Sequence, residues 1–523
     1  MNWGDLFFDL FYVAAAYNLS YIIKTDTNFE GLLYFCGCFF ATFYNFWQNK
    51  LFYDARFQEG DDILHVLIEI LQLCCLALAV LHIRPVKYMS HGSEDVSMFA
   101  FSLANLMGVI TTLFKIFETG FIWCNGQTEV LRYMAITDAL WTIFPCFTLM
   151  LIATISSGVV YFGSADDSNG SDYRFLADAA GTSDSYGSDF SSVEAESESL
   201  TVNHLPIFLC FILLFTRAPF QLLFYSLRSK DDFKSVTVPM NIGFVIHRFG
   251  EWIMLMLGES VLSLLIIDVV EDRDFYITFF TGVISVVLLQ FLHFKSQPHH
   301  AKDHAMRKSR PRGLFFGVLM LIYSAALIVV GVCYKMLLTE YSKEEQKEQE
   351  YAKNVRLLAG GDDGGDSAYS TEERQLRIAT LFGGSLALVF ACLDLMSLAH
   401  NGVGETMDRC HEEKHGKIRI KGLMMVGVTR LALIALIAST FKIVTTPEYV
   451  ALFGLGAIIA QIGIRFIGNI YFPSGSSNHA NSHEEEHGPN STHGDAEAVP
   501  SYDLGAVATH DNYYDEENPQ LRK

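Results

Sequence analysis

The sequence lacks the motifs that mark several common enzyme classes. It contains no Walker loop, no dinucleotide-binding fingerprint, no His-Glu-x-x-His zinc motif and no nucleophile elbow. The ten cysteines form neither a disulfide framework nor a zinc site, because most lie inside apolar runs, where a thiol behaves as a small hydrophobic group. We therefore expect a protein that is not an enzyme and that needs no cofactor.

A short secretory leader with a small-residue cleavage site is also missing, so we expect the first apolar helix to be retained. Hydrophobic residues make up 51% of the chain, which includes 42 phenylalanines. The formal net charge of -21 comes mostly from polar inserts and the tail, so it gives no evidence for a basic partner or for nucleic acid. This composition predicts a multi-pass membrane protein whose first partner is the lipid bilayer.

Apolar runs long enough to cross a bilayer recur along the chain, and only helices can bury their own backbone polar groups in lipid. The predicted fold is therefore all-α, a bundle of about twelve transmembrane helices that divides naturally into two halves of six. The expected spans are 5–23, 31–48, 63–83, 96–117, 131–155, 205–225, 242–267, 275–294, 314–337, 376–398, 423–441 and 449–471.

The same pattern divides the chain into six segments. Polar, acidic segments rich in Ser and Gly have too few large apolar residues to form a core, so we expect them to be disordered. The segments are helices one to five in 1–155, a disordered outer loop in 156–202, helices six to nine in 203–337, a polar charged loop in 338–374, helices ten to twelve in 375–472, and a disordered, histidine-bearing tail in 473–523.

Lys and Arg gather in loops that follow even-numbered helices, for example in 295–312 and 409–421. The positive-inside rule makes this side cytosolic and places both termini in the cytosol. Asn169 begins an Asn-Gly-Ser sequon on the opposite side, where glycosylation is possible. The sequence does not indicate which cellular membrane holds the protein.

The seventh predicted span carries four ionisable side chains in an otherwise apolar run: His247, Arg248, Glu251 and Glu259. At about 100° per residue, the last three form one polar stripe along the helix. Such groups inside a membrane need a protein interior or a water-filled cavity. Glu259 follows Gly258, whose missing side chain would allow a helix or a substrate to approach.

Further acids lie near the first and third spans. Asp9 lies one turn deeper than Asp5 in the first span, and is a functional candidate or one half of an ion pair. Asp61 and Asp62 are placed to cap the third helix. His65 and Glu69 follow at i and i+4, and a buried acid beside an imidazole is a candidate proton-handling pair.

Three stretches of the sequence resemble those of a known protein family. They are Asp5-Leu-Phe7-Phe8-Asp9-Leu-Phe-Tyr-Val13, then Arg56-Phe57 with Asp61, Asp62 and His65, and finally Arg248-Phe249-Gly250 followed by Leu257-Gly258-Glu259-Ser260. The family that they resemble is the low temperature requirement A family of multi-pass membrane proteins. Two departures are His247, where the family usually has an acid, and Glu251, where it has an apolar residue. The resemblance implies a membrane protein linked by name to growth in the cold, with no established molecular activity.

Histidine pairs support a competing hypothesis, a membrane metalloenzyme. His300 with His304 and His411 with His415 share the His-x-x-x-His spacing, which could hold a metal between i and i+4 nitrogens. Polar loops produce this spacing by chance, and the further clusters of membrane di-iron enzymes are missing, so we expect no metal site.

The function that these residues favour is movement of a small solute or ion across the membrane. Glu259, or the pair of His65 and Glu69, would carry protons, and Arg248 would be an anion anchor or a charge partner. We expect a polar cavity lined by Asp9, Glu69, Arg248, Glu251 and Glu259. The alternative is a membrane sensor or scaffold in cold or stress adaptation, in which the charges only hold helices together.

Overall fold

The computed structural model describes residues 3–57, 63–86, 89, 97–121, 133, 136–137, 139–168, 204–213, 223, 240–267, 269–298, 303–357, 366–401, 416–440 and 446–471. Within these ranges the backbone forms helices joined by turns and irregular segments, and no strand occurs. The fold is therefore all-helical, as the apolar runs predict. The predicted loop 156–202, apart from the end of one helix, and the predicted tail 473–523 lie outside the described residues.

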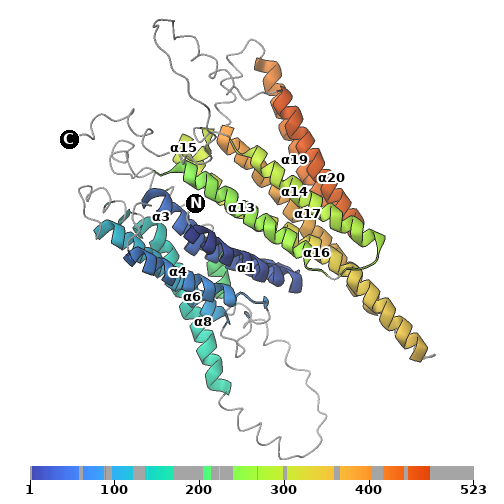
Figure 1. Ribbon diagram of the computed structural model, residues 1–523, viewed down its shortest axis with the longest axis horizontal. Helices are drawn as coiled ribbons and strands as arrows, with labels where there is room; N and C mark the ends of the chain where they lie inside the picture. Colours follow the sequence, from blue (N-terminus) through green and yellow to red (C-terminus); the bar gives the residue numbers. More distant parts are fainter. Residues whose placement is uncertain are drawn as a thin grey trace, which may run out of the picture. The chain divides into compact units, whose positions relative to one another are not determined.

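The N-terminal helices cover the first five predicted spans (Figure 1). One of them is longer than expected, because α2, the π-helical segment η1 and α3 follow one another without a break and carry the helix to Phe57. These elements are α1 (Trp3–Thr25), α2 (Phe29–Thr42), η1 (Phe43–Gln48), α3 (Asn49–Phe57), α4 (Ile63–Leu81), α6 (Ser97–Phe121), η2 (Ala139–Ile143) and α8 (Phe144–Ser168).

The C-terminal helices cover the predicted spans from the seventh onward. α16 continues well into the segment 338–374 that the sequence assigns to a loop, because Glu, Lys and Gln are good helix formers. These elements are α13 (Ile242–Leu265), α14 (Arg273–Ser296), α15 (Ala305–Lys308), α16 (Arg310–Leu357), α17 (Asp366–Asn401), α19 (Gly416–Thr440) and α20 (Pro447–Tyr471).

Two of the helices that build the site begin at an asparagine cap. Asn28 Oδ1 accepts a hydrogen bond of 2.8 Å from the Gly31 N–H at the start of α2. Asn241 Oδ1 accepts one of 3.0 Å from the Phe244 N–H at the start of α13. Both bonds satisfy a backbone donor that the first turn of a helix leaves free.

Seven helices in the described part of the chain are long and apolar enough to cross a membrane: α4, α6, α8, α14, α16, α17 and α20. α13 is as long but carries Arg248, Glu251 and Glu259. Large apolar side chains point outward from several of these helices, among them Leu67, Ile152, Val287 and Ile459. Exposed apolar surface of this kind marks contact with a membrane or another protein.

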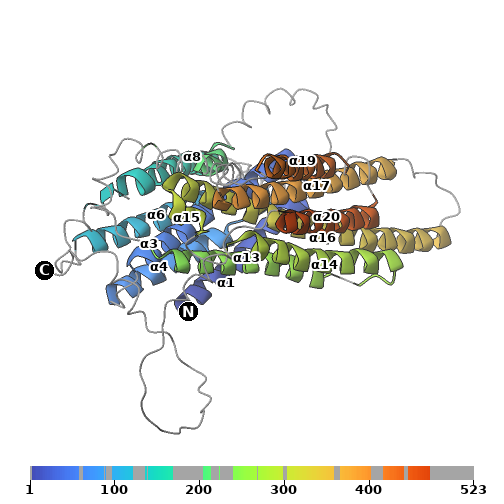
Figure 2. The same cartoon turned by 90° about the horizontal axis from the view of Figure 1, so that it is seen from above.

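Contacts divide the helices into two groups along the chain (Figure 2). In the first group α1 packs on α2 and α4, α4 packs on α6, and α6 packs on α8. In the second group α13, α14, α17 and α20 pack on α16, while α19 packs on α17 and α20. The span Pro311–Tyr341 of α16 is 83% buried, which makes it the central helix of its group. α13 contacts both α1 and α16 and so joins the two groups.

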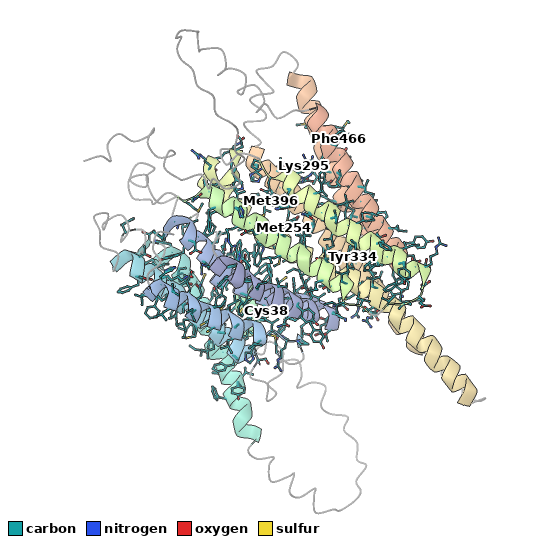
Figure 3. The ribbon with its side chains drawn as sticks, viewed as in Figure 1. Cys38, Met254, Lys295, Tyr334, Met396 and Phe466 are labelled. Carbon is teal, nitrogen blue, oxygen red and sulfur yellow. The ribbon has the colours of Figure 1, made fainter. Side chains whose placement is uncertain are left out.

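Side chains fill the spaces between the helices (Figure 3). Of the labelled residues, Cys38, Tyr334 and Met396 are buried, whereas Met254 and Phe466 are exposed. In each group of helices, buried apolar side chains surround the few buried charges. Electrostatic interactions among those charges are therefore stronger than they would be in water.

Candidate functional site

The sequence predicts one polar cavity, but the structure divides its five residues among three places. Asp9, Arg248 and Glu251 form the Arg248 cluster between α1 and α13. Glu69 belongs to the His65 cluster, which α3, α4 and α6 build. Glu259 lies farther along α13, beside α16.

In the Arg248 cluster, a buried guanidinium is held by two carboxylates. Arg248 Nη1 donates to Asp9 Oδ2 at 2.8 Å, and Nη2 donates to Asp9 Oδ1 at 3.0 Å. Nη1 also donates to Glu251 Oε2 at 2.7 Å, one turn along the same helix. A bidentate pair of this kind is among the strongest hydrogen-bonded contacts in proteins. The geometry thus supports the role of charge partner for Arg248.

Aromatic side chains enclose this cluster. The Trp47 Nε1–H donates to Asp9 Oδ1 at 3.2 Å, and the Trp47 ring packs against Trp252 at 4.6 Å and Phe249 at 5.4 Å between centroids. Phe8 is buried too, 5.7 Å from the Tyr12 ring. The aromatic rings exclude water from the ion pair, which strengthens it.

Two other residues of the stretches that carry the family resemblance make no polar contact in this cluster among the described atoms. Phe7 lies on α1, although its side chain is outside the described atoms. Gly250 lies on α13, and a Cβ added there would be 3.7 Å from the Phe294 ring, an ordinary contact. Neither position therefore shows a role in chemistry.

The His65 cluster contains two lysines that the carboxylates hold inside the helices. Lys50 Nζ lies 2.8 Å from Asp54 Oδ2 and 2.7 Å from Glu69 Oε1. Lys115 Nζ lies 3.3 Å from the same Glu69 oxygen. Glu69 is therefore neutralised by two ammonium groups, one from α3 and one from α6.

The His65 imidazole lies between two carboxylates. Its Nε2 is 3.6 Å from Glu69 Oε1, and its Nδ1 is 3.7 Å from Glu118 Oε2. The ring also stacks on Tyr53 with 5.5 Å between centroids. The Glu118 side chain is only 2% exposed, and neither of its oxygens has a hydrogen-bond partner among the described residues.

The charges of the described groups in this cluster do not balance while His65 is neutral. Three carboxylates, those of Asp54, Glu69 and Glu118, face the ammonium groups of Lys50 and Lys115. One negative charge remains, and a buried unpaired charge is unfavourable by several kcal/mol. A single proton on His65 or Glu118 would restore neutrality.

The same place is also close to a metal-binding geometry. One ligand atom each from Asp54, His65 and Glu69 lies within 4.8 Å of the others. The Lys50 ammonium already lies against both carboxylates, however, so a metal ion would have to displace it. These residues therefore fit a proton better than a metal ion.

Glu259 is another buried acid among the residues that the sequence predicts for the site. It is 2% exposed; Oε1 accepts a hydrogen bond of 3.1 Å from the Ser263 hydroxyl, while Oε2 has no partner in the described part of the chain. Lys335 on α16 interacts with it electrostatically. Ser260 packs closely on Gly331 of α16, whereas a Cβ at Gly258 would meet no described atom within 4 Å.

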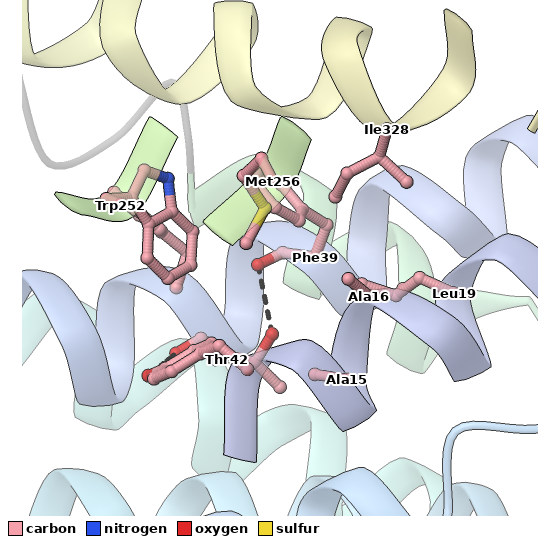
Figure 4. A pocket seen from close by; sticks show the side chains of 10 residues that line it. Ala15, Ala16, Leu19, Phe39, Thr42, Trp252, Met256 and Ile328 are labelled. Carbon is pink, nitrogen blue, oxygen red and sulfur yellow. Dashed lines mark hydrogen bonds between the residues drawn. The ribbon is translucent and has the colours of Figure 1, made fainter. Parts of the chain in front are cut away.

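A small cavity lies between the Arg248 cluster and Glu259 (Figure 4). It has room for about one water molecule. Its lining is mostly apolar, because Trp252 and Met256 occupy the face of α13 between Arg248 and Glu259. The other lining residues are Tyr12, Ala15, Ala16, Leu19, Phe39, Thr42, Phe43 and Ile328.

Several predicted residues contribute to none of the three places. Arg56 is half-buried near the end of α3. His304 caps α15, where its Nδ1 accepts a hydrogen bond of 3.3 Å from the Met306 N–H, and its ring is 4.5 Å from that of His400. Asp61, Asp62, Asn169, His300, His411 and His415 lie outside the described residues.

Sequence reasoning missed Lys50 and Glu118 as members of the site. Lys50 precedes Asp54 by four positions, and Lys115 precedes Glu118 by three, so each pair lies on one face of its helix. That spacing could have indicated from the sequence that each lysine lies beside an acid. Lys50 and Asp54 were expected near or within a connection, and Glu118 lies just past the predicted end of its span.

Comparison of the chain with models of known protein families, with curated proteins and with solved structures gives no match. A function must therefore be inferred from the three places themselves.

Proposed function

We propose that this protein moves a small solute or ion across a membrane, with a proton as the coupling ion. The observation that carries the proposal is the position of His65 between Glu69 and Glu118, 3.6 and 3.7 Å from the nearest carboxylate oxygens. Imidazole can accept a proton on one nitrogen and release it from the other, which suits it to transfer between two acids.

The charges around His65 favour a proton on the side of the imidazole that faces Glu118. Lys50 and Lys115 already neutralise Glu69, whereas Glu118 faces His65 alone in the described part of the chain. A proton is therefore best placed on His65 or Glu118. Both separations exceed a hydrogen bond, so transfer would need a small rotation of the ring or one bridging water.

The cavity between Arg248 and Glu259 supports the second part of the proposal. It lies away from the ends of α1 and α13, and solute sites of membrane transporters lie near the middle of the membrane. Basic loops would place the His65 and Arg248 clusters toward the cytosolic ends of their helices, and Glu259 toward the opposite side. In this orientation both termini are cytosolic.

The proposed architecture has about twelve membrane-spanning helices in two sets of six. The division of contacts into an N-terminal and a C-terminal group of helices supports it. The resemblance to the low temperature requirement A family bears on the site, because its three stretches supply Asp9, His65, Arg248 and Glu259.

A non-transporting sensor or scaffold is the second candidate, and one observation favours it. The Arg248 guanidinium joins α1 to α13 by a bidentate pair, which is the geometry expected of a charge that only fastens helices. In that case Glu118 and Glu259 would also be structural.

Proton flux into liposomes that contain the purified protein separates the two candidates. We expect the wild type to pass protons under an imposed pH gradient and voltage, and Glu118→Gln and Glu259→Gln to lose that flux while remaining folded. Glu373→Gln is the matched control, because Glu373 is exposed and pairs with Arg377 on its own helix. It should conduct like the wild type.

A well-folded wild type that passes no protons would contradict proton coupling and favour the scaffold. Loss of folding in both glutamine variants, with the wild type silent, would point the same way. Flux that survives both substitutions would show that protons use another path.

A further inference from the structure

A separate group of buried charges lies at the meeting of α14, α17, α19 and α20. Asp394 on α17 is its centre. Arg430 Nη1 lies 3.2 Å from Asp394 Oδ1, and Arg465 Nη2 lies 3.3 Å from the same oxygen. The Gln461 amide donates to both Asp394 oxygens at 3.1 Å. We call these four residues the Asp394 cluster.

Figures 1 and 2 show the helices of this cluster side by side. Figure 3 labels Met396, two residues after Asp394, and Phe466, the residue after Arg465. The cluster lies within the apolar stretches of α17 and α20 that are long enough to cross a membrane.

Among the described residues, the Asp394 cluster carries an uncompensated positive charge, the opposite of the His65 cluster. Two guanidinium groups share one carboxylate, and the Arg465 side chain is only 10% exposed. Arginine does not lose its proton in proteins, so deprotonation cannot remove the surplus. A surplus charge at this depth is unfavourable unless an anion is present.

Several hydrogen-bond donors around the surplus charge are unused. The Nε–H groups of Arg430 and Arg465 and the Tyr323 hydroxyl have no hydrogen-bond partner among the described residues. Tyr323 is fully buried and interacts electrostatically with Arg465. Its ring stacks on that of His293, whose Nδ1 is also unpartnered within the described ranges. Buried donors without acceptors are rare in folded proteins.

We propose that the Asp394 cluster binds one small monovalent anion, of the kind represented by chloride. A single negative charge would balance the cluster, and the unused N–H and O–H donors are the groups that bind such an ion. The site is distinct from the His65 cluster and the cavity, so it does not depend on the proposed transport of protons.

The experiment uses the full chain purified in detergent. Its thermal unfolding is followed as sodium gluconate is replaced by sodium chloride at constant ionic strength. A ligand that binds only the folded state raises the unfolding temperature progressively as its concentration increases, here by about 2 °C or more. Arg430→Gln removes the surplus charge and should abolish the dependence on chloride. Arg377→Gln, which changes an exposed arginine of α17, should retain it.

Three outcomes would overturn the proposal: no rise in the unfolding temperature of the wild type with chloride, an equal rise in Arg430→Gln, or stabilisation by phosphatidylglycerol without any by chloride. The last would assign the cluster to a lipid phosphate. If Arg430→Gln does not fold, crystals of the wild type soaked in iodide decide the matter. An anomalous peak beside Arg430 and Arg465 supports the site, and its absence there refutes it.

Discussion

Arg248 is a residue whose charge is tolerated in an apolar helix because two carboxylates surround it. The sequence predicts one of them, since Glu251 lies three positions away on the same helix face. Asp9 is 239 positions away, and nothing in the local pattern indicates that it meets Arg248. The pairing depends on which helices pack together, and apolar periodicity does not specify that.

Removing one member of the Asp9–Arg248 pair should destabilise the protein more than removing both members. Asp9→Leu removes the bidentate partner of the buried guanidinium, and we expect a loss of about 3 kcal/mol in the free energy of unfolding. Asp9→Leu combined with Arg248→Met should be less destabilised than the single variant, because no charge is left unpaired. Unfolding of the single and double variants in detergent completes a double-mutant cycle.

Glu251→Gln is the control for this cycle. Glu251 is more exposed than Asp9 and also contacts the exposed His247, so its loss should cost less. If the effects of Asp9→Leu and Arg248→Met on stability simply add in the double variant, Asp9 and Arg248 do not stabilise each other.

The His65 cluster shows the same limit of sequence reasoning. His65 and Glu69 were predicted as a pair because an i, i+4 spacing places them on one face. Glu118 belongs to another helix and faces His65 only after α4 has packed on α6. Its lack of hydrogen bonds, which makes it a candidate proton site, is a property of the packed structure.

At the scale of elements, apolar runs predicted where the described helices lie, but not their ends or their contacts. The π-helical segment Phe43–Gln48 has no signature in the sequence pattern that we used, yet it continues α2 into α3. This continuation puts Lys50 and Asp54 on a helix instead of in a loop. π-Helical turns occur often at functional sites.

Close packing between elements gives a prediction at two glycines. A Cβ at Gly331 of α16 would clash with the Ser260 side chain and lie 2.9 Å from its Cα, so Gly331→Ala must push α13 away from α16. We expect a loss of about 1–3 kcal/mol in the free energy of unfolding. Thermal unfolding in detergent measures the change.

Gly258→Ala is the matched control for that change. The sequence suggested that Gly258 allows close approach of a helix, but an added Cβ there meets no described atom within 4 Å. Alanine is also the better helix former, so the variant should be as stable as the wild type or more so. A Gly331→Ala protein with unchanged stability would show that α13 and α16 can separate without loss.

At the scale of the whole molecule, the described helices form two groups joined through α1, α13 and α16. Counted over the described residues, two clusters depart from neutrality, and they lie in different groups. The His65 cluster has a negative surplus and the Asp394 cluster a positive one. A proton and an anion would each be drawn to a separate place in such a protein. Composition alone could not show this, because it counts charges without their partners.

The stability of the molecule should depend on pH through His304, which lies between α15, α16 and α17. Burial lowers the pKa of its imidazole from 6.5 to about 4, and its Nδ1 accepts the Met306 N–H only while unprotonated. The unfolded chain therefore takes up a proton near pH 6.5 that the folded chain does not take up until about pH 4. This contribution to stability is complete above pH 6.5 and is lost as the pH falls toward 4.

Thermal unfolding between pH 7 and pH 4 tests this expectation in the wild type and in His304→Asn. Asparagine can cap α15 in the same way but does not titrate, so the variant should lose less stability over this range. His400, whose ring is 4.5 Å away, is unchanged and serves as a common background in both proteins. Parallel pH profiles would show that His304 is protonated at a similar pH in the folded and unfolded chains.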